Sequence, residues 1–487
     1  MYVLAIDEGT TGVRAVVFDD RSARLGSAYE EIGAAFPRPG WMEQDPLHIW
    51  EATRRVIADA LRAARLVPKD IAAVGIATQR ATTAVWERAT GKPIYPAVSW
   101  QDSRTVERVA ELLQDGIYTN AMASATKLEW ILRERDRHGR GAAGELCFGT
   151  LDTWLAWQLS GGRAHVTDAS NASCTGLYNF ATGDWDADVL GKVAVPAAVL
   201  PRVVDSNAQY AETDADVFGA AVPLAGLAGD QQAAMFGELA LETGAMKVTF
   251  GTSAMVDVNT GDFPVLSQNG AFPLVLWGLG GARRFCLEGT VITAGAAVQW
   301  LRDGLGVIAS ADECGPLAAS VPDSGGVWAI PALQGLGTPY LEPGGRAVIG
   351  GISRGTGRAH IVRAVLEGVA YRTREVLETL MTDAQAPRPQ CLRVDGGVAA
   401  NDVFLQFLAD TLGVAVERPE TVQATALGAA YLAGLGAGVW RSIDEVRHAW
   451  RSGGVFAPKL AAAERDGRFH AWQQAVAAAR LGARCGA

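Results

Sequence analysis

The stretch AIDEGTTGVRAVVFD, residues 5–19, places charged and hydroxyl side chains between two apolar runs. These runs cover residues 3–6 and 15–18, and each is long enough to form a buried strand. Gly9 lies between them, where the chain has to reverse direction. The pattern therefore predicts a strand, a tight turn and a second strand that follows at once.

The predicted turn carries groups that are suited to phosphate. Backbone N–H groups around a glycine turn can form a concave anion site. Thr10 and Thr11 add hydroxyl donors, and Arg14 adds a guanidinium whose fork matches phosphate. Asp7 has the opposite chemistry, that of a hard oxygen ligand for Mg²⁺ or its water shell. The alternative is an ordinary hairpin with glycine in its turn, and the turn alone does not decide between the two.

A second stretch, KVTFGTSAMVDVN at residues 247–259, repeats this plan of strand, Gly-Thr turn and strand. Its turn contains Gly251 and Thr252, so two such loops would hold a polyphosphate from both sides. The repeat predicts a duplicated architecture of two similar domains, residues 1–240 and 241–487. Strand-like runs alternate with amphipathic segments along the chain, which is the α/β pattern.

Hydrophobic periodicity locates the clearest elements of both halves. We expect helices over residues 49–64, 231–241, 360–381 and 401–412. We expect strands over residues 71–78, 246–250, 327–331 and 391–395.

Composition narrows the class of protein. The 487 residues include 49% hydrophobic residues and carry a net charge of −10, which argues against nucleic acid or an anionic membrane as partner. No apolar run reaches the length of a membrane span, and no secretion signal opens the chain. The six cysteines form no CxxC motif, and the six histidines form no HExxH motif. We expect a cytoplasmic protein with reduced thiols and without a zinc site.

Two glycine-rich segments in the second half are candidates for nucleotide contact. In VDGGVAANDVFLQF, residues 394–407, Gly396 and Gly397 allow a nucleotide to approach the backbone, although they also fit a plain strand-to-helix turn. The helix ATALGAAYLAG, residues 424–434, has small residues suited to close packing or to a position under an adenine. Packing is the interpretation we prefer for this helix.

Asp230 ends the apolar run of LAGLAGDQQAAMFGEL, residues 224–239. As a helix N-cap it would stabilise the following helix by about 1 kcal/mol. As a general base it would lie at the mouth of a cleft between domains. The two roles are compatible.

Several stretches are similar to those of the FGGY family of carbohydrate kinases, and within it most closely to glycerol kinases. The similarity runs nearly end to end and includes RPGWMEQDPLHIW (38–50), FGTLDTWLAWQL (148–159), GDQQAAMFG (229–237) and ALQGLGTPY (332–340). Both signature segments of the family are present, MASATKLEWILRE at residues 122–134 and AVIGGISRGTGRAHIVRAVLEG at residues 347–368.

The resemblance implies two actin-like (ribonuclease-H-like) α/β domains with an interdomain catalytic cleft. The N-terminal domain would hold the polyol or sugar acceptor, and the C-terminal domain would hold most of the ATP. The cofactors would be ATP and Mg²⁺. Family members are often homodimers or homotetramers, so the same is expected here.

The resemblance also assigns roles to individual residues. It implies that Asp7 holds Mg²⁺, through water, and that Asp230 is the general base. The groups that it implies are Thr10, Thr11, Arg14, Gly251 and Thr252 for the ATP phosphates, Gly396, Gly397 and Asn401 for the adenosine, and Arg80, Trp100, Asp230 and Gln231 for the acceptor.

Three positions depart from the glycerol kinase pattern. Ala81 stands where those enzymes have a glutamate, while Met122 and Met255 stand where they have aromatic residues. We therefore expect weak activity on glycerol and a preference for a four- or five-carbon polyol or ketose. A non-catalytic, ATP-binding actin-like regulator is a further alternative, although retention of Arg80, Trp100 and Asp230 argues against it.

Overall fold

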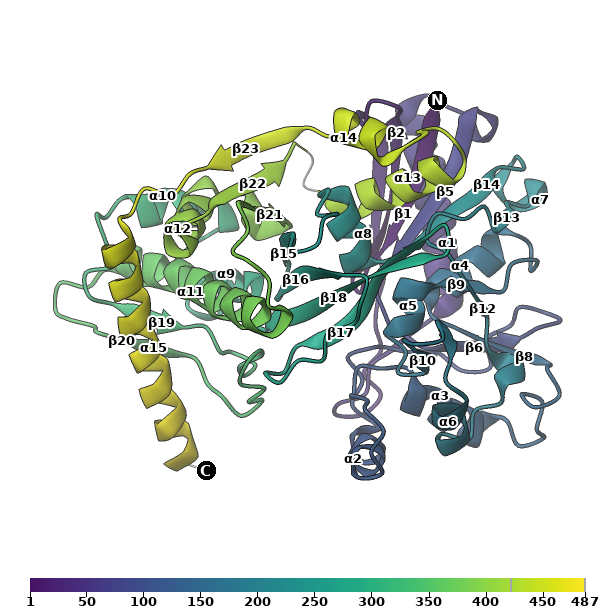
Figure 1. The fold of residues 1–487 in the computed structure, drawn as a ribbon, viewed down its shortest axis with the longest axis horizontal. Coiled ribbons are helices and arrows are strands. Elements are labelled where there is room, and N and C mark those ends of the chain that lie inside the picture. Colours follow the sequence, from purple (N-terminus) through teal and green to yellow (C-terminus); the bar gives the residue numbers. More distant parts are fainter. Residues whose placement is uncertain (421–422, 486–487) are drawn as a thin grey trace. The chain divides into compact units, whose positions relative to one another are not determined.

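The computed structural model describes residues 1–420 and 423–485, which form two compact units (Figure 1). Unit 1 comprises Met1–Leu239, Leu274–Arg284 and Thr425–Trp450. Unit 2 comprises Ala240–Pro273, Phe285–Ala424 and Arg451–Ala487. Each unit contains its own sheet and helices, so the predicted two-domain α/β class is confirmed.

Unit 1 is built on a six-stranded sheet of order β13-β14-β5-β1-β2-β3. Strand β1 pairs antiparallel with β2 and parallel with β5, which pairs parallel with β14. The predicted strand–turn–strand at the N-terminus is confirmed, and Gly9 N donates to Gly12 O across its turn at 2.9 Å. The strand bounds are β1 Tyr2–Glu8, β2 Gly12–Asp19, β3 Arg24–Glu31, β5 Ile71–Thr78, β13 Ala211–Glu212 and β14 Pro223–Gly229.

The second large sheet, most of which belongs to unit 2, repeats these strand directions; residues 274–284 of its strands β17 and β18 and the turn between them belong to unit 1. Its order is β17-β18-β16-β15-β21-β22-β23, in which β15 pairs antiparallel with β16 and parallel with β21, and β21 pairs parallel with β22. The predicted duplication is therefore present in the topology. The bounds are β15 Met246–Phe250, β16 Ala254–Gly261, β17 Phe272–Leu279, β18 Ala282–Val291, β21 Cys391–Asp395, β22 Ala415–Pro419 and β23 Ser452–Phe456.

Helix α1 of unit 1 (Pro46–Ala64) packs against β2 and β3. It begins three residues before the predicted start because the Asp45 side chain caps it and Pro46 is its first residue. The other α-helices described in this unit are α2 Val106–Gln114, α3 Ala125–Arg135, α4 Leu151–Leu159, α5 Ala169–Ser173, α6 Ala187–Lys192, α7 Ala215–Phe218, α8 Asp230–Gly237, α13 Ala424–Gly436, whose first residue falls in unit 2, and α14 Ile443–Ala449.

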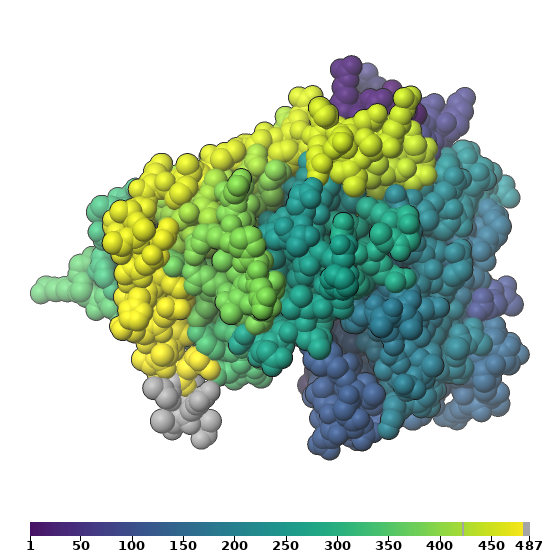
Figure 2. All heavy atoms as spheres, viewed as in Figure 1, coloured from purple at the N-terminus to yellow at the C-terminus, as the bar shows by residue number. Residues whose placement is uncertain are grey.

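Helix α13 comes from the C-terminal part of the chain, but almost all of it belongs to unit 1 (Figure 2, yellow-green). It packs at backbone distance, because a Cβ added to Gly75 would lie 2.1 Å from Ala429 O. A Cβ added to Gly428 would lie 1.7 Å from Ala233 O. The predicted packing role of this small-residue helix is confirmed.

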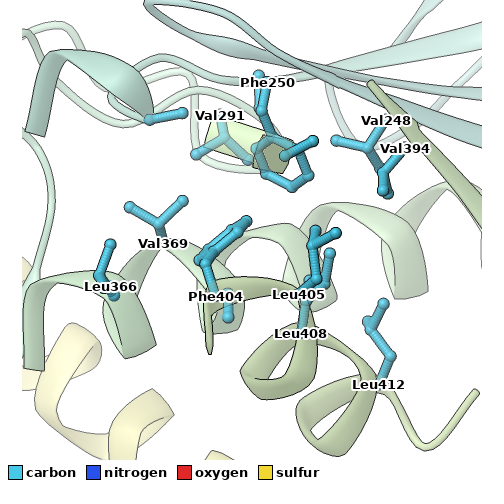
Figure 3. Close-up of a cluster of buried hydrophobic side chains, with 14 of the residues drawn as sticks. Val248, Phe250, Val291, Leu366, Val369, Val394, Phe404, Leu405, Leu408 and Leu412 are labelled. Carbon is cyan, nitrogen blue, oxygen red and sulfur yellow. The ribbon is translucent and has the colours of Figure 1, made fainter. Parts of the chain in front are cut away.

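In unit 2, helices α11 (Arg358–Ala384) and α12 (Asp402–Leu412) contribute to the core beside the central strands (Figure 3). The rings of Phe250 and Phe404 meet edge to face there, with centroids 5.0 Å apart. Helix α15 (Ala462–Cys485) packs by Trp472, whose Nε1 donates to Ala329 O of β19 (Trp328–Ile330) at 2.9 Å.

The predicted strands over residues 71–78, 246–250 and 391–395 match β5, β15 and β21 residue for residue. The predicted helix over residues 231–241 was wrong at its C-terminal end, since α8 stops at Gly237. Glu238 caps the helix, and Leu239 adopts a left-handed φ of 56° that no helix can continue. None of the described helices is long and apolar enough to cross a bilayer.

Candidate active site

The turn between β1 and β2 groups four of the predicted site residues. Asp7 is paired directly with Arg14 across the two strands, so their side chains leave the same face of the sheet. The Arg14 guanidinium also lies 5.2 Å from the ring centroid of Tyr29, which limits where it can point. Thr11 is exposed at the tip of the turn.

Thr10 connects the turn to a predicted acceptor residue. Trp100 Nε1 donates a hydrogen bond of 2.9 Å to Thr10 Oγ1. Gln44 Nε2 donates to Thr10 O at 3.0 Å, so the residue is held at two atoms. Residues that are 90 positions apart in sequence are thus brought together at one end of the sheet.

Arg80 and Asp230 form an ion pair, with Arg80 Nε 3.1 Å from Asp230 Oδ1. The side chains are 14% and 28% exposed, so both remain partly accessible. A Cβ added to Gly229 would lie 2.8 Å from Arg80 Cγ and Cδ, so glycine is required for this approach. Gln231 adjoins the pair, and its N–H donates to Asp230 Oδ1 at 2.8 Å.

The expected N-cap role of Asp230 was wrong. Helix α8 is capped by Gly229, and Asp230 is its first helical residue. Because the Asp230 carboxylate accepts from Arg80 Nε and from Gln231 N, its oxygen does not close the first turn.

A buried network behind the turn was missed by sequence reasoning. Gln79 Nε2 donates to Glu8 Oε1 at 2.9 Å and to Gln44 Oε1 at 3.1 Å, and Gln79 Oε1 accepts from Thr82 Oγ1 at 3.0 Å. Thr82 Oγ1 in turn accepts from Trp100 N at 3.2 Å. The network therefore connects β1 to the loop that carries Trp100. The signal was present, since Glu8 and Gln79 adjoin Asp7 and Arg80 in the sequence.

Burial raises the pKa of Glu8 well above its usual value. The hydrogen bond from Gln79 opposes this rise, while the negative charges of Asp7 and Asp230 add to it. Among the described residues, Glu8 Oε2 is buried without a hydrogen-bond partner. Burial and the neighbouring carboxylates therefore act together against the charged form of Glu8.

Lys127 connects the loop of Trp100 to the loop of Met122. Its Nζ donates to Trp100 O at 3.1 Å and to Met122 O at 2.8 Å. Burial lowers the pKa of Lys127 to about 7, against the attraction of Asp102. The carbonyl of Ala81 accepts from Ser124 Oγ at 2.9 Å, so Ala81 and Met122, two of the three positions that depart from the glycerol kinase pattern, lie on tightly connected loops.

Unit 2 positions the second predicted phosphate loop. Gly251 and Thr252 follow β15 and are exposed. Gly251 O accepts from Gly295 N at 2.9 Å, and Thr252 O accepts from Ala294 N and Ala296 N at 3.1 and 2.9 Å. The loop is thus tied to the start of helix α9 (Gly295–Gln299), and sequence reasoning did not find this helix.

The predicted adenosine segment follows β21 in the same unit. Gly396 has a φ of 89°, and a Cβ there would lie 2.4 Å from Phe250 O, so its glycine has a structural reason. A Cβ on Gly397 would meet nothing within 4 Å, which leaves open space beside the backbone. Asn401 caps α12, and its oxygen accepts from Val403 N and Phe404 N.

Family models match most of the chain. The N-terminal domain of the FGGY family of carbohydrate kinases matches residues 2–237, and its C-terminal domain matches residues 246–437. The chain belongs to the FGGY family of carbohydrate kinases. It is a phosphotransferase of the glycerol kinase-like type.

Relatives named glycerol kinase are similar to this chain over nearly the full length. "Glycerol kinase" of Ralstonia nicotianae is 47% identical, with 99% of this chain and 98% of that protein covered. "Glycerol kinase 2" of Thermotoga maritima is 45% identical, with 98% of each covered. The crystal structure of Plasmodium falciparum glycerol kinase with ADP superposes with a TM-score of 0.90 at 30% identity, with 98% of each chain covered.

Proposed function

We propose that this chain is an ATP-dependent kinase that transfers the γ-phosphoryl group to a hydroxyl of glycerol or a related polyol or sugar, with Asp230 as general base. The observation that carries the proposal is the ion pair of Arg80 and Asp230. Both of its side chains are partly accessible, and the pair lies in the same unit as the contact between Thr10 and Trp100. The relatives named glycerol kinase support this reaction class.

In this mechanism Asp230 accepts the proton of the acceptor hydroxyl as its oxygen attacks the γ-phosphorus. Such a base contributes ~10²–10⁴-fold, and positioning with charge neutralisation supplies most of the rest. The guanidinium of Arg80 orients the carboxylate and donates to the acceptor, and Trp100 and Gln231 complete the acceptor contacts. We propose that Thr10, Thr11, Arg14, Gly251 and Thr252 bind the phosphates.

Residues of unit 2 fit a nucleotide. Gly397 borders open space, and the amide nitrogen of Asn401 is available since its oxygen caps α12. These two residues, with Gly396, would hold the adenosine. The ADP in the Plasmodium falciparum structure supports nucleotide binding by this fold. The interdomain cleft predicted from the sequence stays a prediction.

Asp7 fits Mg²⁺ as one ligand that would bind the ion through water. Among the described residues there is no cluster of three or more ligating side chains, which agrees with Mg²⁺ bound by one or two carboxylates and the substrate phosphates. When bound, Mg²⁺ neutralises charge on the transferring phosphoryl group.

The cysteines bear on the compartment in which the protein works. Cys147, Cys314 and Cys391 are free thiols, which supports a reducing compartment. We propose a cytoplasmic enzyme with a small-molecule acceptor as its partner, active as a homodimer or homotetramer.

The general base is tested by Asp230→Asn. We expect turnover to fall by at least ~10²-fold because the amide accepts no proton. ADP affinity, measured by calorimetry, should stay within about twofold since the adenosine contacts lie in unit 2. Turnover close to that of the wild type would remove Asp230 from the role of base.

A second candidate is an acceptor longer than glycerol. Ala81 cannot supply the carboxylate that glycerol kinases have there, and Met122 is 38% exposed in place of an aromatic residue. The test is ATP-dependent phosphorylation of glycerol, dihydroxyacetone, erythritol, threitol, erythrulose, ribitol, xylulose and ribulose. Preference for a four- or five-carbon compound supports this candidate, and saturation by glycerol at low micromolar concentration contradicts it.

A further inference from the structure

Asp168 is a fully buried carboxylate that accepts five hydrogen bonds. Ser170 and Asn171 each donate from the backbone at 3.0 Å and from the side chain at 2.9 Å. Ser206 Oγ donates at 2.6 Å. Capping α5, a helix of five residues, requires only the backbone donors, so the three side-chain donors need another explanation.

Two of these donors extend the network to other segments. Ser170 Oγ accepts from Gly229 N at 2.9 Å, and Ser206 Oγ accepts from Gly278 N at 3.1 Å. A serine hydroxyl has one proton, and an ionised carboxylate only accepts. Each serine therefore gives its proton to Asp168 and turns a lone pair toward a backbone N–H.

The first of these N–H groups belongs to Gly229, the residue before the proposed base. Ser170 thus fixes the peptide from which Asp230 starts helix α8. This contact is made to the main chain next to Asp230 rather than to its carboxylate.

The second N–H group belongs to the hairpin segment Leu274–Arg284, which is part of unit 1. Ser173 Oγ accepts from Val275 N at 3.1 Å, and Gln232 Nε2 donates to Val275 O at 3.3 Å. Helices α5 and α8 therefore both hold this segment.

Strand β18 starts in this hairpin and ends at Val291, which pairs with Ala254 beside the loop of Gly251 and Thr252. The serine contacts themselves fall on β17 (Phe272–Leu279), which a turn at Gly280 and Gly281 joins to β18.

We propose that Asp168 is a positioning residue which, through Ser170 and Ser206, fixes both the backbone of the base and the hairpin segment Leu274–Arg284 of unit 1. The inference rests on the proposed role of Asp230. Burial raises the pKa of Asp168, and the hydrogen bonds from Ser206, Asn171 and Ser170 oppose that rise. The five donors favour the ionised form, which both serine contacts require.

Ser170→Ala is the first test, since it removes one hydroxyl and keeps the carboxylate. We expect kcat to fall about tenfold or more, because small misplacements of a catalytic group are costly. KM for ATP should stay within about twofold. The matched control is Thr167→Val, which removes a hydroxyl that donates to the equally buried Asp152 at 2.7 Å, without contact to Gly229. A similar fall of kcat in this control would overturn the inference.

A double-mutant cycle of Ser170→Ala with Asp230→Asn separates positioning from general damage. If Ser170 acts through Asp230, then Ser170→Ala should lower kcat only a little further in a protein that already carries Asp230→Asn. If Ser170→Ala still lowers kcat tenfold in the Asp230→Asn background, this inference is overturned and the proposed role of Asp230 is left intact. Wild-type turnover of Asp230→Asn overturns the proposed base, and this inference with it.

Hydrogen–deuterium exchange tests the two contacts separately. Ser206→Ala should speed exchange in residues 274–284, and Ser170→Ala should speed it at residues 227–232. Uniform exchange changes across unit 1 in both variants would overturn the division into two contacts.

Discussion

Ala81 shows how one residue can set the choice of acceptor. It is buried, and its backbone has a φ of 60°, the left-handed region that non-glycine residues seldom adopt. Its carbonyl is held by Thr83 Oγ1 and Ser124 Oγ, at 3.1 and 2.9 Å. The backbone at this position is thus fixed, and only the side chain is free to change.

Ala81→Glu should raise kcat/KM for glycerol, since a hydrogen bond to a charged group is worth ~1.5–3 kcal/mol. That energy corresponds to roughly 10–150-fold in kcat/KM. Steady-state kinetics with glycerol at saturating ATP measures it. Ala81→Gln is the matched control, with the same shape and no charge. Equal effects of both substitutions, or no gain in either, would contradict the role assigned to the missing carboxylate.

Sequence reasoning reached the residues whose chemistry is visible in a short motif. Short motifs are enough to predict Asp7, Thr10, Arg80 and Asp230 as site residues, and the structure joins Arg80 to Asp230 and Thr10 to Trp100. Their functional roles remain proposals. Gln79 adjoins Arg80 in the sequence, but its role comes from partners 35 and 71 positions away, which no short motif shows.

At the scale of elements, the phosphate loop of unit 2 depends on the start of α9. A Cβ on Gly295 would lie 2.5 Å from Gly251 O, which is closer than real contacts allow. Gly295→Ala should therefore displace the loop and raise KM for ATP by about tenfold, while KM for the acceptor changes little.

Kinetics at varied ATP, with the acceptor saturating, measures this effect. The control is Gly191→Ala in α6, where an added Cβ meets nothing within 4 Å and a helical position favours alanine. An unchanged KM for ATP in Gly295→Ala would show that the contact with Gly251 does not shape the loop.

The sequence predicted where strands lie better than it predicted to which unit each element belongs. Strand β15 could be read from its own residues, as a short apolar run before a Gly-Thr turn. Helix α13 could be read as a helix for close packing, but not as part of unit 1. Its place depends on close packing against Gly75 and Gly226, which lie on strands about 200 or more residues earlier in the chain. The sequence around these two glycines does not indicate which helix packs against them.

At the scale of the whole molecule, the two sheets show why a short repeat was informative. The hairpins β1–β2 and β15–β16 each start a sheet with the same strand directions. A Gly-Thr turn joins the two strands in both hairpins, at Gly9-Thr10 and at Gly251-Thr252, so the shared motif and the shared strand directions occur together. The strands around the two turns share apolar character rather than identical residues, since a buried strand needs only apolar residues of suitable size.

The stability of the whole chain should fall on the acid side because of one buried histidine. His165 Nε2 lies 2.8 Å from Phe148 O, and its ring packs edge to face against Trp86 and Trp157. Burial lowers the pKa of His165 to about 4, against the opposing hydrogen bond to Phe148. The pKa of an unfolded histidine is about 6.5.

Between pH ~6.5 and ~4 the unfolded chain therefore binds the proton and the folded chain does not. The free energy of unfolding should fall as the pH falls through this window, by at most about 1.4 kcal/mol per pH unit from this group. Urea unfolding followed by tryptophan fluorescence at about pH 7 and about pH 5 measures the slope. His165→Gln keeps a neutral donor for Phe148 O and should give a shallower slope. The control, His470→Gln at an exposed position of α15, should keep the wild-type slope, and an equal slope in all three proteins would show that His165 protonates alike in both states.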